Sequence, residues 1–167
     1  MTCFLNKIEA LPRLWIFGAG HVGTALAPMA QAAGFQVTVV DERAEWAAPA
    51  RFPAEVCLRD AEPLDLLRRQ PLDPADYAVV VTHSHPLDEA LIQALSAAPP
   101  AYVGLIGSRA KWAKFRARLA ERGVLPAFLD RVRCPVGADI GAATPGEIAV
   151  SIAAELVAVK RRAPAPA

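Results

Sequence analysis

The stretch Leu14–Asp41, LWIFGAGHVGTALAPMAQAAGFQVTVVD, decides the fold of this 167-residue chain. It opens with a short apolar run and continues through three glycines with the spacing G-x-G-x-x-G. An Ala-rich helical segment follows, and then a second apolar run that stops at an acid. Strand, glycine turn, helix, strand and acid occur in this order in the βαβ unit that binds dinucleotides. The stretch therefore predicts a Rossmann-like nucleotide-binding unit.

The glycines and polar residues of this stretch each have a physical role in such a unit. Gly18 permits the tight turn out of the first strand, and Gly20 has no Cβ, so a pyrophosphate can approach the backbone. Gly23 lets the helix pack close to the sheet. His21 begins the helix, whose free N-terminal amides and partial positive charge attract phosphate. Asp41, about 20 residues further on, is expected to accept hydrogen bonds from ribose hydroxyls.

The composition limits the class of protein. With 54% hydrophobic residues the chain can bury the core of one domain, and its net charge of +1 creates no global field for nucleic acid or an anionic membrane. Because no apolar run reaches about 18 residues, we expect no transmembrane helix. The three cysteines are odd in number and widely spaced, which favours a reducing cytoplasm over a disulfide framework.

Strand and helix patterns alternate along the chain and predict an α/β fold, a doubly wound parallel sheet in three αβα layers. We expect a lead-in over residues 1–12, one Rossmann-like domain over 13–162 and a disordered Ala/Pro tail over 163–167. Pro28 predicts a kink or local irregularity of the helix near Met29. The expected strands are 14–17, 36–40, 55–58, 77–82 and 102–106; the expected helices are 21–33, 64–69, 86–97 and two that start near 109 and 145, with a looser region at 124–133.

A polar segment that begins at Thr82 follows the fourth expected strand. In an open parallel sheet, ligands bind at the carboxyl ends of the strands near the switch point, which usually lies between the first and fourth strands. His83 and His85 should therefore face the glycine loop across one cleft, with Asp88 on the helical turn after them. The alternative is that both histidines are ordinary loop residues. No third ligand is evident for a permanent metal site.

A second candidate position follows the fifth expected strand. At Ser108 and Arg109, a hydroxyl, a guanidinium and backbone N–H groups converge into an anion site. The stretch from Arg109 to Arg133 contains eight basic residues and only two acidic ones. This basic stretch is either a solvated helix face or a patch for a phosphate-bearing ligand or an acidic partner protein. Cys134, just beyond it, is either a core residue or a thiol that faces the cleft.

Several motifs together resemble a known family: FGAGHVG, VVDER.EW, VVVTHSH..D, YVGLIGSR.K, RCPVG.DIG and TP.EIAVSIAAE. In this order they are similar to the C-terminal domain of the xanthine dehydrogenase accessory proteins (the XdhC/CoxI family), over about residues 13–160. The resemblance implies a cytoplasmic bacterial factor that binds molybdenum cofactor, protects its labile sulfurated form and helps to insert it into a molybdenum hydroxylase. The partners that it implies are the hydroxylase apoenzyme and a cysteine desulfurase.

The chain departs from the family pattern in two places. Family members usually carry an N-terminal domain before the Rossmann part, whereas this chain begins almost at the first expected strand. We therefore expect cofactor binding to need a partner N-terminal domain on another chain or a homodimer. Ala138 stands where the family usually has leucine.

The residues leave several hypotheses open for the ligand and for the role of the protein. The ligand is molybdopterin, its dinucleotide form or NAD, and the role is that of a non-catalytic accessory protein, an NAD-dependent oxidoreductase or a nucleotide-sensing regulatory module. The glycine loop and Asp41 support the first two roles equally. The expected cofactor-binding residues are Gly18, Gly20, His21, Gly23, Asp41, Thr82, His83, His85, Asp88, Ser108 and Arg109, with no catalytic residue and no metal ligand.

Overall fold

The computed structural model describes residues 11–162, so the expectations for residues 1–10 and for the tail at 163–167 lie outside this range. The strands are β1 (Arg13–Phe17), β2 (Gln36–Asp41), β3 (Cys57–Asp60), β4 (Tyr77–Val80), β5 (Tyr102–Leu105) and β6 (Val132–Arg133). The helices are α1 (His21–Ala32), α2 (Pro63–Arg69), α3 (His85–Leu95), α4 (Arg109–Glu121), α5 (Pro126–Leu129) and α6 (Pro145–Arg162), with a 3-10 turn at Pro49–Arg51.

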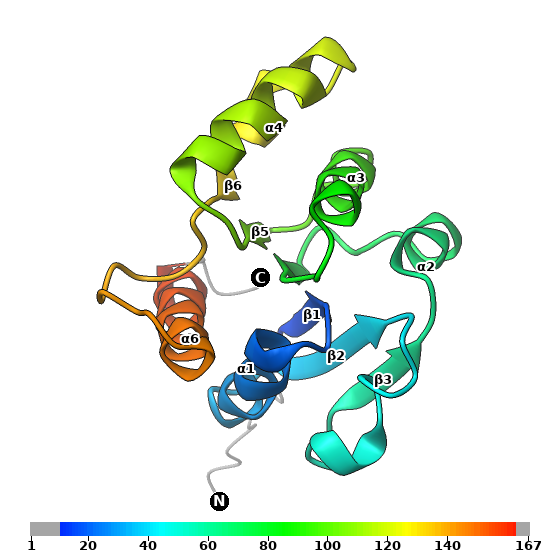
Figure 1. Cartoon of the computed structure of the whole chain (residues 1–167), viewed down its shortest axis with the longest axis vertical. Coiled ribbons are helices and arrows are strands. Elements are labelled where there is room, and N and C mark those ends of the chain that lie inside the picture. Colours follow the sequence, from blue (N-terminus) through cyan, green and yellow to red (C-terminus); the bar gives the residue numbers. More distant parts are fainter. Residues whose placement is uncertain (1–10, 163–167) are drawn as a thin grey trace, which may run out of the picture.

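The six strands form one parallel sheet in the order β3-β2-β1-β4-β5-β6. Figure 1 shows α1 and α6 on one face of the sheet and α2 and α3 on the other. The predicted three-layer, doubly wound architecture is thus confirmed. The strand order reverses at the β1–β4 pair, where Phe17 is the register partner of Val80. The carboxyl ends of these two strands are therefore the switch point at which such sheets bind ligands.

The strands bury both faces because successive side chains point to opposite sides. Leu14 and Ile16 pack into the core with α1 and α6. Trp15 and Phe17 pack into the other core, with Leu91 of α3. The near-continuous apolar character of β1 and β4 follows from this two-sided burial.

Several predicted boundaries differ from the structure. β6 was not predicted, because a two-residue strand carries no detectable period. β4 ends at Val80 instead of residue 82, although the Val81 N–H still donates to the Phe17 carbonyl at 2.8 Å. α1 continues through Pro28 to Ala32 without a break in the helix. Packing of its buried face, which includes Leu26, holds the helix despite the missing hydrogen bond.

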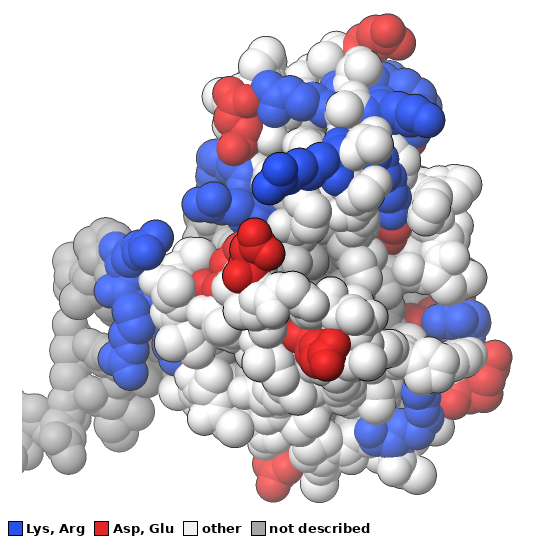
Figure 2. All heavy atoms as spheres, turned by 60° about the vertical axis from the view of Figure 1, so that its left-hand side comes forward, with Lys and Arg blue, Asp and Glu red and all other residues white. Residues whose placement is uncertain are grey.

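Basic residues gather at one end of the molecule. Figure 2 shows Lys and Arg over the upper end, where Figure 1 places α4. Many of these charges are paired: Arg116 lies 2.5 Å from Asp130, and Arg118 lies 2.5 Å from Glu89. The basic stretch is therefore less positive in the fold than in the sequence. Within residues 11–162, no helix is both long and apolar enough to cross a membrane.

Candidate functional site

Two of the three loop glycines are required by the fold itself. Gly18 has a φ of 117°, and a Cβ on it would lie 2.4 Å from the Val81 carbonyl oxygen. A Cβ on Gly23 would lie 2.0 Å from the Gly18 carbonyl oxygen. Both positions exclude any side chain, because the turn lies against the end of β4 and α1 then packs directly on the turn.

Gly20 differs from these two glycines. Its φ is −66°, which any residue adopts, and a Cβ there would meet nothing within 4 Å. It is the N-cap of α1, and no side chain caps that end, whereas Ser84 and Ser108 cap α3 and α4. The start of α1 therefore has no side-chain cap and has open space beside Gly20, where the partial positive charge of the helix lies.

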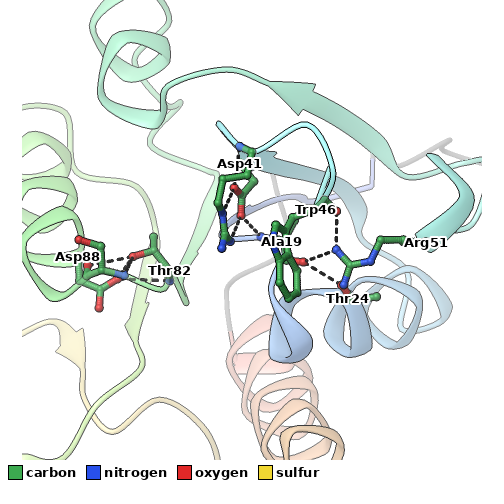
Figure 3. A network of polar contacts seen from close by, with 9 residues as sticks. Ala19, Thr24, Asp41, Trp46, Arg51, Thr82 and Asp88 are labelled. Carbon is green, nitrogen blue, oxygen red and sulfur yellow. Dashed lines mark hydrogen bonds and ion pairs between the residues drawn. The ribbon is translucent and has the colours of Figure 1, made fainter. Parts of the chain in front are cut away.

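The peptide between these glycines is held in place on several sides (Figure 3). The Ala19 N–H donates to Oδ2 of Asp41 at 2.8 Å. The Ala19 carbonyl accepts from the Thr24 hydroxyl at 3.0 Å and from Nη1 of Arg51 at 3.1 Å. These three hydrogen bonds within the protein hold the glycine loop in this conformation.

Asp41 ends β2, as the sequence predicts, but its carboxylate is already occupied. The side chain is 4% exposed and also accepts three hydrogen bonds from Arg43: from the backbone N–H, from Nε and from Nη2, at 2.8 to 3.0 Å. Burial alone would raise the pKa of Asp41, but the hydrogen bonds from Arg43 and Ala19 together outweigh it and lower the pKa. Asp41 therefore stays ionised.

An aromatic and cationic cluster lies beside this loop. The Trp46 ring contacts the guanidinium carbons of Arg43 and Arg51, at 4.9 and 4.5 Å from its centroid, and meets the His21 ring edge-on at 5.4 Å. His21 is the first residue of α1, as predicted, and its side chain is exposed. Arg51 was not predicted, because nothing in the sequence links it to a carbonyl 32 residues earlier.

Four of the predicted residues meet in a hollow at the switch point. It has a volume of about 10 Å³, and its lining includes Gly18, Asp41, Thr82 and His83. Of these, His83 is exposed and Thr82 half-buried. This hollow joins the glycine loop to the end of β4, as the topology predicts.

Asp88 does not face this hollow as a free polar group. It is fully buried, accepts from the Thr82 hydroxyl at 2.7 Å and pairs with Nζ of Lys111 at 2.8 Å. Lys111 also donates to the Ile106 carbonyl at 3.2 Å. Asp88 thus ties the loop after β4 to the first turn of α4. Figure 3 shows its contact with Thr82.

The remaining predicted residues lie in a different place. A groove of about 620 Å³ between α3 and α4 has a lining that includes His85, Ser108 and Lys114. Arg109 is exposed and lines neither hollow. Of the two histidines expected to face the glycine loop across one cleft, His83 lines the switch-point hollow, whereas His85 lines the groove between α3 and α4.

Cys134 belongs to the core. It is half-buried, packs against the cluster that contains Phe115, and its Sγ lies 3.6 Å from the Gly107 carbonyl oxygen. Burial raises its pKa to about 11, although the nearby Lys111 acts in the opposite direction. The thiol is therefore protonated at neutral pH and a poor nucleophile. Among residues 11–162, no group of three or more His, Cys, Asp or Glu is placed to hold a metal ion.

Comparison with known proteins confirms the resemblance drawn from the motifs. Residues 14–156 match the family described as the XdhC Rossmann domain. The chain is 37% identical over 159 residues to a probable xanthine dehydrogenase subunit of Bacillus subtilis, and 36% identical over 165 residues to the "Uncharacterized protein YqeB" of Escherichia coli. It also superimposes on the crystal structure of a xanthine dehydrogenase from Bacillus halodurans with a TM-score of 0.82 and 31% identity.

These relatives are longer proteins. The matches cover 95% of this chain and 46% of the B. subtilis relative, 98% and 30% for the E. coli relative, and 95% and 46% for the B. halodurans structure. The chain thus spans less than half the length of each of them. The similarity is to their Rossmann part.

Proposed function

Since this chain belongs to the XdhC Rossmann-domain family of xanthine dehydrogenase accessory proteins, we propose that it binds molybdenum cofactor and passes it to a xanthine dehydrogenase-type molybdenum hydroxylase. The cofactor is cargo, to be protected and then released. Its chemistry sets what a carrier needs: a grip for its phosphate, polar groups for the pterin and no strong ligation of the metal.

The observation that carries this proposal is the open space in front of Gly20. The chain's own packing requires the neighbouring glycines but not this one. A glycine without a steric role inside the protein fits a backbone that something else approaches. The uncapped N-terminus of α1 directly after it favours an anion, so the phosphate of the cofactor is the group that fits.

The residues at the switch point suit the rest of the cargo. Thr82 and His83 line the hollow beside the glycine loop and offer a hydroxyl and an imidazole to a pterin edge. Hydrogen bonds hold a ligand without the long residence of metal–thiolate bonds, which suits a protein that must give its cargo up. The proposal gives no part at this position to His85 and Ser108, which line the groove between α3 and α4, or to Arg109, which lines neither hollow.

The same proposal extends to the partners. The recipient is the hydroxylase apoenzyme, and a cysteine desulfurase supplies the sulfur that makes the cofactor active. In this proposal, a second copy of the chain or a partner N-terminal domain adds to the binding site. We propose that these encounters take place in the cytoplasm.

The test is cofactor retention and transfer. Wild-type protein, Gly20→Val and Gly146→Val would be loaded with molybdenum cofactor, separated from free cofactor, and mixed with apo-hydroxylase. Gly146 is the matched control, since a Cβ there also meets nothing within 4 Å, but it lies at the start of α6.

We expect the wild type and Gly146→Val to retain the pterin, detected by mass spectrometry, and to activate the apoenzyme. Gly20→Val should fold normally and do neither, because its side chain would occupy the phosphate position. Equal retention by Gly20→Val and the wild type would show that the glycine loop is structural only.

A further inference from the structure

The end of β2 shows which ligands the glycine loop accepts. In a dinucleotide-binding unit, the acid at this position takes the hydroxyls of the adenosine ribose. Here Asp41 accepts four hydrogen bonds within the protein, one from Ala19 and three from Arg43. A carboxylate has about four lone-pair positions, so none is left for a ribose.

Ribose hydroxyls would compete poorly for this carboxylate. Two of the bonds from Arg43 are charge-assisted and about twice as strong as neutral ones. Arg43 lies only two residues beyond Asp41, so holding the pair together requires little ordering of the chain. Trp46 contacts the same guanidinium at 4.9 Å and gives it a second attachment.

Rotation of Asp41 toward a ligand would also release the glycine loop. The Ala19 N–H, which is buried, would lose its acceptor. The loop that grips the phosphate would then loosen at the moment of binding. The Asp41 carboxylate holds the loop through its hydrogen bond from Ala19. It cannot also accept hydrogen bonds from a ribose without giving up that contact.

We infer that Arg43 closes the ribose position, so that the glycine loop takes phosphate or diphosphate esters that present no ribose diol to Asp41. This inference rests on the proposed function and narrows its ligand: the phosphate-terminated pterin fits, and a nicotinamide or other dinucleotide whose ribose must reach Asp41 does not. Arg43 is thus a specificity-determining residue.

A pair of nucleotides that differ only in the diol provides the test. ADP and 2′,3′-dideoxy-ADP would be titrated into the wild type, Arg43→Ala, Arg43→Met and Arg68→Ala by calorimetry. Arg43→Met keeps an unbranched stem against Trp46 and guards against misfolding of the alanine variant. Arg68→Ala is the control, since it removes a guanidinium from another Asp–Arg pair, one whose arginine side chain is 71% exposed on α2.

We expect the wild type and Arg68→Ala to bind the two nucleotides within about twofold of each other. Both Arg43 variants should free Asp41 and prefer ADP by about tenfold, the scale of one or two net hydrogen bonds. ADP binding that appears only in the Arg43 variants supports the inference equally.

A wild type that already prefers ADP by tenfold, with no change in the Arg43 variants, would overturn the inference. So would the absence of binding by every variant. The first result leaves the phosphate grip intact, since both nucleotides still bind. The second also speaks against ADP at the phosphate grip, and retention of molybdenum cofactor by the wild type but not by Gly20→Val then separates the two proposals. The two proposals can therefore fail separately.

Discussion

At the scale of single residues, the three glycines of one motif have two different kinds of role. Gly18 and Gly23 must be glycine, because nearby carbonyl oxygens leave no room for a Cβ. At Gly20, by contrast, a Cβ would meet no atom of the described residues within 4 Å. The spacing of the motif therefore reflects both folding and binding, and substitution separates the two.

Replacing Gly23 by alanine should destabilise the fold, while replacing Gly20 by alanine should not. The new methyl group at Gly23 would lie 2.0 Å from a backbone oxygen, so the helix must shift. We expect a loss of about 3 kcal/mol in the free energy of unfolding for Gly23→Ala. For Gly20→Ala we expect a change within about 0.5 kcal/mol. Urea denaturation measures both, and equal effects would contradict the assigned roles.

The carboxylate of Asp41 gives a stability that depends on pH. Because its folded pKa is lowered, its contribution is present above the ordinary value of 3.8 and is lost as the pH falls through the lower folded value. Asp41→Asn should therefore cost about 1–3 kcal/mol at pH 7. The difference from the wild type should shrink toward pH 3. Denaturant titrations at pH 7, 5 and 3 check this, and a difference that is constant with pH would count against this role of the Asp41 charge.

At the scale of secondary-structure elements, one buried ion pair joins two helices that follow neighbouring strands. Asp88 on α3 and Lys111 on α4 meet at 2.8 Å, with side chains 1% and 13% exposed. Thr82 is held by the same carboxylate. The pair fixes the position of the loop after β4 and separates the switch-point hollow from the α3–α4 groove.

Breaking this pair on one side should cost more than replacing both partners. Lys111→Met would leave the Asp88 charge buried and unpaired, at about 3–5 kcal/mol. Adding Asp88→Asn removes the charge but keeps an acceptor for Thr82, so the double variant should be more stable than Lys111→Met alone. Chemical denaturation of the two single variants and the double variant completes the cycle. Simple additivity of the two losses would mean that the residues do not interact.

The same pair shows where sequence reasoning ends. The parallel sheet, its switch point between the first and fourth strands and the position of Asp41 could be predicted, because period, glycine spacing and turn residues are visible in the sequence. The Asp88–Lys111 contact could not, because 23 residues separate the partners and an exposed polar residue has the same sequence appearance as a buried one. The sequence shows that Arg43 lies two residues after Asp41. Only the fold shows that Arg43 donates three hydrogen bonds to the Asp41 carboxylate.

At the scale of the whole molecule, the proposed site is a surface more than a pocket. The switch-point hollow has a volume of about 10 Å³, which is space for about one water molecule. Small-molecule sites usually bury roughly 70–90% of their ligand. A pterin laid over Thr82 and His83 on a single copy of residues 11–162 would therefore remain largely in contact with water.

A cover from a second copy or a further chain should thus govern how long the cofactor survives. We expect the lifetime of bound molybdenum cofactor in air to rise with protein concentration across the range in which sedimentation shows a dimer forming. If the cover is a different chain, lifetime should rise on addition of that chain instead. Gly20→Val, which blocks the phosphate grip, should show neither effect and serves as the control.

A long lifetime that is independent of protein concentration, measured on a monomer without any partner, would show that one copy shields the cofactor by itself. The small volume of the hollow would then have to reflect a site that opens when the ligand binds.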